Sequence, residues 1–252
     1  MNKKLTEKNS LLYLLAVILL FEVLLFVSSC FSGVAGKILY YLSFILPIAL
    51  FFIITRTCRV SLHGVPVKLK RENIKLFIPT VAPTVATVFL ISFLTSIVLS
   101  KFGIEDTLTD VSGNIFLVII LHALLPAVFE EMLFRYIPMA LLADFSKWRV
   151  VLVSSLLFAL AHASLYQIPY AFIAGAVFII LDIMFDSIMP SLIIHFLNNF
   201  VSVFWLRNSE STVFSTVYVV TLVVFTVVSV TVMVMKKHSY KEKFCLHFDK
   251  QR

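Results

Sequence analysis

The sequence is poor in charge, glycine and cysteine. Of its 252 residues only 14% are charged and six are glycine, while Phe alone occurs 25 times. Soluble domains carry about 25% charged residues, so the low charge excludes an ordinary soluble protein. The many apolar side chains exclude a disordered chain, and three cysteines are too few for a disulfide scaffold.

The three cysteines are Cys30, Cys58 and Cys245. They lie far apart in the sequence and form neither a CxxC pair nor any other spacing typical of metal ligands. We therefore expect three free thiols.

Apolar residues are what the sequence has in excess, at 60% of the chain. A membrane-crossing helix needs about 20 predominantly apolar residues, so the chain has room for about eight spans. We predict an all-α fold, a polytopic membrane helical bundle embedded in lipid. The apolar runs place the spans at 11–32, 37–55, 75–100, 115–140, 149–166, 168–185, 188–206 and 212–235.

Lysine and arginine gather at the start of the chain, after the second span and in the tail. The first connection holds only Lys37, and the third is mainly acidic, with Glu105, Asp106 and Asp110. Because basic loops stay in the cytoplasm, we predict that both termini are cytoplasmic. The residues that carry this prediction are Lys3, Lys4, Lys8, Arg56, Arg59, Lys68, Lys70, Arg71, Lys75, Lys236, Lys237, Lys241 and Lys243.

The net charge of +7 is thereby explained by membrane orientation, and we expect no nucleic-acid partner. Segment 61–75 is too polar to span a membrane. Its mixture of Val, Leu and Lys fits an interfacial stretch, and a solvated basic loop fits as well.

Three charged residues stand well inside the fourth span: Glu130, Glu131 and Arg135. Each would cost about 2.5–3.5 kcal/mol near the centre of a membrane helix if unpaired. Glu131 and Arg135 are four residues apart, so they face each other on one side of a helix and can form an ion pair. Glu130 points about 100° away from Glu131 around the helix and is not part of this pair. An unpaired carboxylate inside a membrane is a candidate for proton transfer.

Two later spans carry further polar pairs at helical spacing. Phe158 and His162 are four residues apart in the fifth span, and His195 and Asn199 are four residues apart in the seventh. Taken alone, such residues more often pack and hydrogen-bond than catalyse. At a rise of 1.5 Å per residue, however, they lie about 10–20 Å from the cytoplasmic side, at the level of Glu130. A carboxylate, two imidazoles and a carboxamide at one level are typical of a hydrolytic site.

The three segments together resemble a known family. Glu130-Glu131-x-x-x-Arg135, Phe158-x-x-x-His162 and His195-x-x-x-Asn199 are similar, in order, to the motifs of the CPBP intramembrane endopeptidases. This family, also called Abi, comprises CAAX proteases and bacteriocin-processing enzymes and includes the type II CAAX prenyl endopeptidases. The resemblance covers about 115–205, and it implies a helical bundle whose cavity opens towards the cytoplasm and lipid.

The resemblance also implies roles for these residues. Glu130 would be the general base, His162 its partner in holding water, and His195 with Asn199 the oxyanion stabilisers. Glu131, Arg135 and Phe158 would give structural support. The chain then divides into N-terminal helices with an interfacial segment (1–110), a catalytic core (111–206), and a last span with a basic cytoplasmic tail (207–252).

These residues leave open whether a metal ion takes part. Glu130, His162 and His195 are a possible zinc set, but HExxH is absent and the ligands would come from three separate helices. We favour water activated by Glu130 and His162 without a cofactor, with zinc as the alternative. The expected substrate is a peptide or protein.

Other functions remain open at this stage. Intramembrane Glu and His also mark proton pathways, so a proton-coupled transporter is one alternative. A non-catalytic immunity or scaffold protein with the same fold is another. Bacterial relatives of the family suggest peptide or bacteriocin processing or self-immunity, in the cell membrane of a bacterium.

Overall fold

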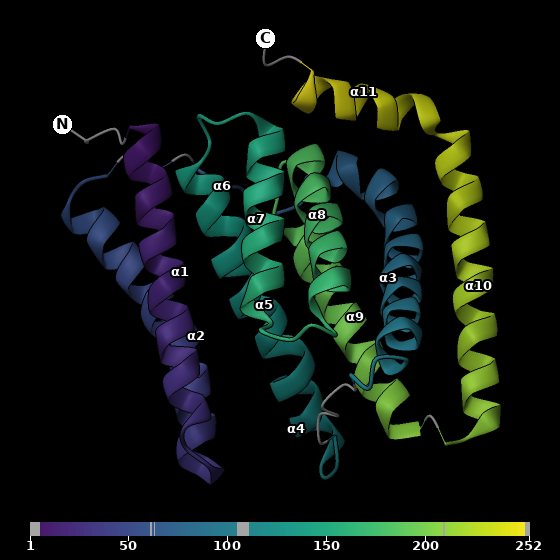
Figure 1. Cartoon of the computed structure of the whole chain (residues 1–252). Helices are drawn as coiled ribbons and strands as arrows, with labels where there is room; N and C mark the ends of the chain where they lie inside the picture. Colours follow the sequence, from purple (N-terminus) through teal and green to yellow (C-terminus); the bar gives the residue numbers. More distant parts are fainter. Residues whose placement is uncertain (1–5, 61, 63, 105–110, 209, 250–252) are drawn as a thin grey trace.

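The structure is a computed structural model that describes residues 6–60, 62, 64–104, 111–208 and 210–249. Every regular element in these residues is helical, as predicted (Figure 1). Five short pieces, α4 (Ile115–Ile119), η1 (Ile120–Leu124), α5 (Leu125–Glu131), η2 (Met132–Tyr136) and α6 (Ile137–Leu141), form one continuous rod. The other helices are α1 (Glu7–Ser29), α2 (Gly33–Thr57), α3 (Arg71–Ser100), α7 (Lys147–Ala161), α8 (Ile168–Phe185), α9 (Met189–Asn208), α10 (Thr212–Met235) and α11 (Lys237–Phe248).

Seven helices in the described residues are long and apolar enough to cross a membrane, the α4–α6 rod counting as one. The remaining predicted span, the fifth at 149–166, corresponds to α7, which has 15 residues and ends at Ala161. It rises about 22 Å, less than the ~30 Å thickness of a hydrocarbon core. The helix stops because Ala163, just after its C-cap, takes a left-handed φ of 48°. The hairpin of α7 and α8 is therefore shorter than its neighbours.

Both described ends of the chain lie at the same end of the bundle (Figure 1). We call this end, where α1 begins and α11 crosses, the terminal face, and the opposite end, which holds Ser29, Ser100 and Asn208, the distal face. Of the described basic residues outside the membrane interior, only Lys37, Lys101 and Arg207 belong to the distal half. The basic residues that carry the prediction thus gather on one face, and the cytoplasmic location of the termini stays a prediction. The predicted contributions of Lys3, Lys4, Glu105, Asp106 and Asp110 lie outside the described residues.

The basic tail contains a helix that the sequence analysis did not predict. Helix α11 lies across the terminal face (Figure 1). Its Phe248 ring packs against Trp148 of α7 with 4.9 Å between centroids, and the Tyr240 hydroxyl donates a hydrogen bond to the Leu76 carbonyl at 2.5 Å. Helix α11 therefore packs over the ends of α3 and α7 at this face.

The connection before α3 is bonded to the turn between α8 and α9. The Pro66 carbonyl accepts a hydrogen bond from the Ile188 amide at 3.1 Å, and the Val67 carbonyl accepts one from the Ser187 hydroxyl at 2.9 Å. Lys70 pairs with Asp186 at 3.2 Å. The described part of this segment thus docks on the turn between α8 and α9.

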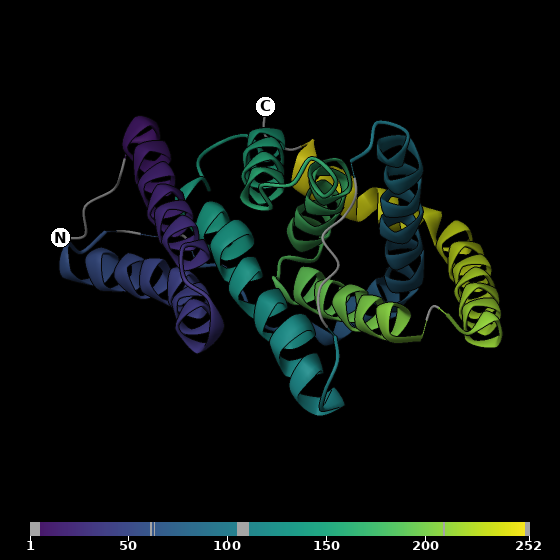
Figure 2. The same cartoon turned by 60° about the horizontal axis from the view of Figure 1, so that its bottom comes forward.

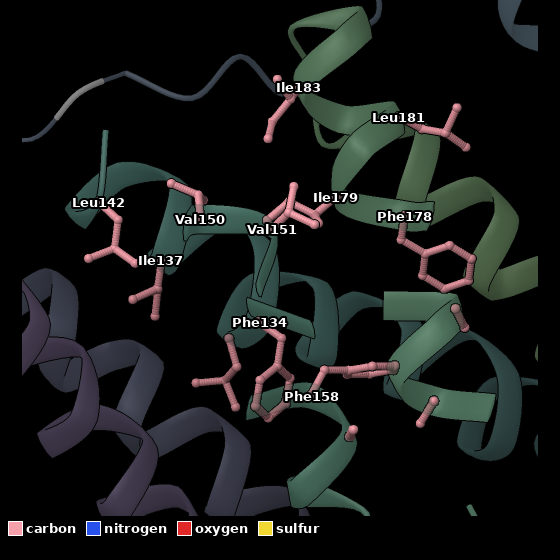
Figure 3. Packing of buried hydrophobic residues seen from close by; sticks show 14 of the residues in the cluster. Phe134, Ile137, Leu142, Val150, Val151, Phe158, Phe178, Ile179, Leu181 and Ile183 are labelled. Carbon is pink, nitrogen blue, oxygen red and sulfur yellow. The ribbon is translucent and has the colours of Figure 1, made fainter. Parts of the chain in front are cut away.

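Apolar packing is concentrated in the terminal half of the bundle. Figure 3 shows side chains of the α4–α6 rod, α7 and α8 that meet there, among them Ile137, Val150 and Ile179. Their exposed fractions are 2% or less. This core fixes the rod against the α7–α8 hairpin, and the rod carries the acidic pair.

Candidate active site

The rod that carries the acidic pair contains two π-helical turns. Turn η1 (Ile120–Leu124) precedes Glu130 and Glu131, and η2 (Met132–Tyr136) follows them. Each turn is followed by a proline, at Pro126 and Pro138. Because proline has no amide hydrogen, each frees a backbone carbonyl one turn earlier.

Neighbouring helices provide donors for the freed carbonyls. The hydroxyl of Tyr41 in α2 donates to the Leu121 carbonyl at 3.1 Å. The hydroxyl of Ser154 in α7 donates to the Phe134 carbonyl. An unsatisfied carbonyl in lipid costs several kcal/mol, so these bonds stabilise the irregular rod and fix it to α2 and α7.

Four charged or polar side chains form a chain of contacts at the centre of the bundle. The Nε atom of Arg135 lies 3.2 Å from Oε2 of Glu131. The Oε1 atom of Glu131 lies 2.6 Å from Nδ1 of His195. The Nε2 atom of His195 in turn lies 3.7 Å from Oε2 of Glu130. The predicted pair of Glu131 and Arg135 is thus present, and it extends to a histidine from another helix.

This chain of contacts is asymmetric in burial. The side chains of Glu131 and Arg135 are fully buried, whereas that of Glu130 is 15% exposed. The rings of Phe158 and Phe178 cover the Arg135 guanidinium, with Cζ at 4.0 and 5.4 Å from their centroids. Aromatic faces stabilise a desolvated cation by up to about 2 kcal/mol. Phe158 therefore lies where it supports the buried ion pair.

Histidine orientation follows from these contacts. The Nδ1 atom of His195 donates to the Glu131 carboxylate, which leaves its Nε2 directed at Glu130. In His162, the C-cap of α7, Nδ1 lies 2.8 Å from the Phe158 carbonyl oxygen. That carbonyl is only an acceptor, so Nδ1 carries the hydrogen and Nε2 of a neutral His162 is an acceptor. Both imidazoles are thus fixed by a bond at Nδ1.

All four predicted catalytic residues line one cavity of about 1180 Å³. Glu130 comes from α5, His162 from the end of α7, and His195 and Asn199 from α9. Glu131 and Arg135 do not line it and lie behind it, in the core. Pockets for ligands typically measure about 300–1,000 Å³, so this one has room for a peptide segment.

The cavity exists because the α7–α8 hairpin is short. In Figure 1 the lower end of α7 lies well above the lower ends of α2, α4 and α9. The turn residues His162, Tyr166 and Gln167 line the space left below the hairpin. Figure 2 shows the rod passing between the α1–α2 pair and the group of α3, α9 and α10, and residues from both sides contribute to the walls. The site is therefore hollowed towards the distal face.

This position conflicts with one expectation. The resemblance implied a cavity that opens towards the cytoplasm, while the basic residues predict that the termini are cytoplasmic. The cavity lies towards the face opposite the termini. Only one of these two expectations is compatible with the structure.

Among the polar residues that the sequence analysis did not single out are His122 in the cavity wall and Asp182 behind it. His122 lines the same cavity, and its spacing of four residues to Pro126 and eight to Glu130 was a readable signal for a shared face. Asp182 of α8 is fully buried, and its Oδ1 accepts a hydrogen bond from the Ser191 amide at 2.9 Å. As a lone carboxylate in an apolar run, Asp182 was also detectable. It fixes the start of α9, the helix that carries His195.

Whether the donors can hold a metal ion depends on how closely they are grouped in the described residues. Among the described residues no three His, Cys, Asp or Glu side chains are grouped closely enough to hold a metal ion. The predicted alternative set of Glu130, His162 and His195 lines the cavity, and the bond at Nδ1 of each histidine leaves its Nε2 as the possible ligand atom. Zinc needs at least three protein ligands around one point. We therefore derive no step through a metal.

Fold and site define the class of this protein as a polytopic membrane protein with an ionisable cluster in an intramembrane cavity. Residues 112–201 match the family model described as type II CAAX prenyl endopeptidase Rce1-like. The match covers a little over a third of the chain and contains all three motifs. It confirms the predicted resemblance to CAAX proteases over this segment and supports a protease. No curated protein and no solved structure matches the chain.

Proposed function

We propose that the chain is an intramembrane endopeptidase in which Glu130 activates water for attack on a peptide bond. One observation carries this proposal: Glu130, His162, His195 and Asn199, from three separate segments, line the same cavity. The family match over 112–201 supports the reaction class. Nothing in this assignment depends on a cofactor.

The Glu130 carboxylate is assigned to the first step. It takes a proton from a water molecule while the water oxygen attacks the scissile carbonyl carbon. His162, whose Nε2 is an acceptor, holds the same water. When the carbon–nitrogen bond breaks, the proton passes from Glu130 to the departing amine.

His195 and Asn199 are assigned to the oxyanion that forms on the carbonyl oxygen. Asn199 contributes its amide hydrogens. His195, whose Nδ1 is bonded to Glu131, donates from Nε2 in its protonated form. With Glu130 and Glu131 ionised, a protonated His195 and Arg135 balance the charge of the cluster. Glu131 and Arg135 thus position His195 and lie away from the cavity.

The proposal is tested with the protein purified in detergent. Its cleavage of each member of a library of quenched fluorescent peptides is measured as an increase in fluorescence. Replacing Glu130 with Gln keeps the shape and removes the basicity, so we expect a loss of about 10²–10⁴-fold in kcat/KM. The matched control is Glu22→Gln, a second carboxylate in a membrane helix that does not line the cavity. Full activity of Glu130→Ala would contradict the mechanism.

A chelator arm addresses the metal alternative. We expect cleavage to persist in a strong chelator and the purified protein to hold no stoichiometric zinc. Chelator-sensitive cleavage together with one bound zinc per chain would replace the water mechanism by a metalloprotease mechanism.

A further inference from the structure

The cavity is displaced towards the distal face. Its walls include residues near the distal ends of α1, α2, α3 and α9, namely Ser29, Gly33, Ser96 and Leu206. The opposite ends of these four helices contribute no described lining residue. A molecule that passes along the cavity to Glu130 therefore comes from the distal face.

The terminal side of the site is closed by apolar side chains. Leu133, Ile137 and Ile194 are 0% exposed and lie between the acidic pair and the terminal ends of their helices. Beyond them, α11 and the connection at 64–70 cover the ends of α7, α8 and α9. Nothing as large as a peptide passes through a core packed in this way.

Charge identifies the two faces. The described connections and helix ends at the terminal face are rich in Lys and Arg, and the distal half holds only Lys37, Lys101 and Arg207 of the described basic residues outside the membrane interior. Basic residues near span ends are retained on the cytoplasmic side. The distal face is therefore the outer face.

The geometry points to a protease that takes its substrate from outside the cytoplasm: a peptide segment exposed at the outer membrane surface enters the cavity below the α7–α8 hairpin and is cut at Glu130. This inference rests on the proposed function and specifies its substrate class. It opposes the cytoplasmic opening implied by the family resemblance.

The chain contains its own reporters of orientation. Cys30 is exposed at the distal end of α1, and Cys58 is exposed at the terminal end of α2. Two variants retain one of these thiols each: Cys58→Ser/Cys245→Ser keeps Cys30, and Cys30→Ser/Cys245→Ser keeps Cys58. Both are labelled with a membrane-impermeant maleimide on intact cells and after permeabilisation.

We expect Cys30 to react on intact cells and Cys58 to react only after permeabilisation. Labelling of Cys58 on intact cells overturns the inference, whatever the result for Cys30. The cleavage assay with Glu130→Gln in detergent is independent of orientation. A reversed labelling pattern with Glu130-dependent cleavage would thus refute the outer route and leave the proposed function intact.

A second arm tests the route itself in a chain without natural cysteines. Ser96→Cys places a thiol on the cavity wall, and Val213→Cys places one on an exposed distal position outside the cavity, with Val213 74% exposed. We expect the impermeant reagent, added outside, to lower cleavage at least tenfold in the Ser96→Cys variant and to leave the Val213→Cys control unchanged. Inhibition only from the cytoplasmic side overturns the inference.

Discussion

The terminal and distal halves of the bundle are built from the same helices but filled differently. In the terminal half, the rod from α4 to α6 packs against α7 and α8 through side chains such as Ile137 and Ile179, which are fully buried. In the distal half, the α7–α8 hairpin is absent and a cavity of about 1180 Å³ takes its place. The short α7–α8 hairpin thus explains why the terminal half is a packed core and the distal half contains the cavity.

Two adjacent glutamates divide between these halves. Glu131 points into the solid side and pairs with Arg135, while Glu130 points into the cavity. Consecutive residues of a helix differ by about 100° in direction, so neighbours in sequence reach different environments. Substitutions behind the cavity should therefore change stability, while substitutions that line it should change catalysis.

The largest loss of stability is expected for Arg135→Met. It leaves Glu131 as a buried carboxylate without its cation, and removing one partner of a buried ion pair costs about 3–5 kcal/mol. Thermal unfolding in detergent measures this loss. Glu130→Gln should change unfolding by less than about 0.5 kcal/mol, because Glu130 is partly exposed in the cavity and stands outside that pair.

A double variant sharpens this prediction. In Glu131→Gln/Arg135→Met no charge of the pair remains, so its loss should be smaller than the sum of the two single losses. The amide oxygen that Glu131→Gln introduces can still accept a hydrogen bond from Nδ1 of His195. Additive losses would mean that the two side chains do not stabilise each other.

A smaller loss is expected at Gly175, where α7 and α8 are in close contact. A Cβ at Gly175 would lie 3.1 Å from Cδ1 of Phe158 and 3.2 Å from Cα of Ser155. Gly175→Val therefore overpacks this contact, which typically costs about 1–3 kcal/mol. Gly64→Ala is the control, since nothing lies within 4 Å of a Cβ there. Equal unfolding temperatures for the two variants would contradict tight hairpin packing.

Much of this arrangement was predictable from the sequence. Apolar runs gave the spans, and helical spacing gave the pair of Glu131 and Arg135. The length of α7 was not predictable, because the helix ends through a left-handed Ala163 and alanine seldom takes that conformation. Residues 162–166, assigned to the span, instead form the turn that lines the cavity.

Contacts between residues far apart in the sequence could not be predicted. The bond from His195 to Glu131 joins residues 64 positions apart, and no spacing rule connects them. The two π-helical turns were not predicted, because the sequence analysis assumed the regular period of an α-helix throughout the span. The catalytic roles of Glu130, His162, His195 and Asn199 stay predictions.

A loss of about 1–2 kcal/mol is expected for Ser154→Ala. The variant removes the donor to the Phe134 carbonyl, which Pro138 leaves free in the buried rod. Ser155→Ala is the matched control, since the Ser155 hydroxyl bonds the Val151 carbonyl within its own helix. Similar unfolding curves for both variants would show that the bond across helices does not hold the rod.

The smallest loss of stability, less than about 0.5 kcal/mol, is expected for Ser96→Phe on the distal wall of the cavity. Space is available there, so the ring fills part of the hollow without displacing the core. Because the same space must admit a peptide, KM should rise several-fold while kcat, set at Glu130, changes less. Leu94→Phe, at an exposed position of α3 that does not line the cavity, should change neither constant. A lower kcat with unchanged KM in Ser96→Phe would instead mean that the distal half moves the catalytic residues and does not serve as the route of the substrate.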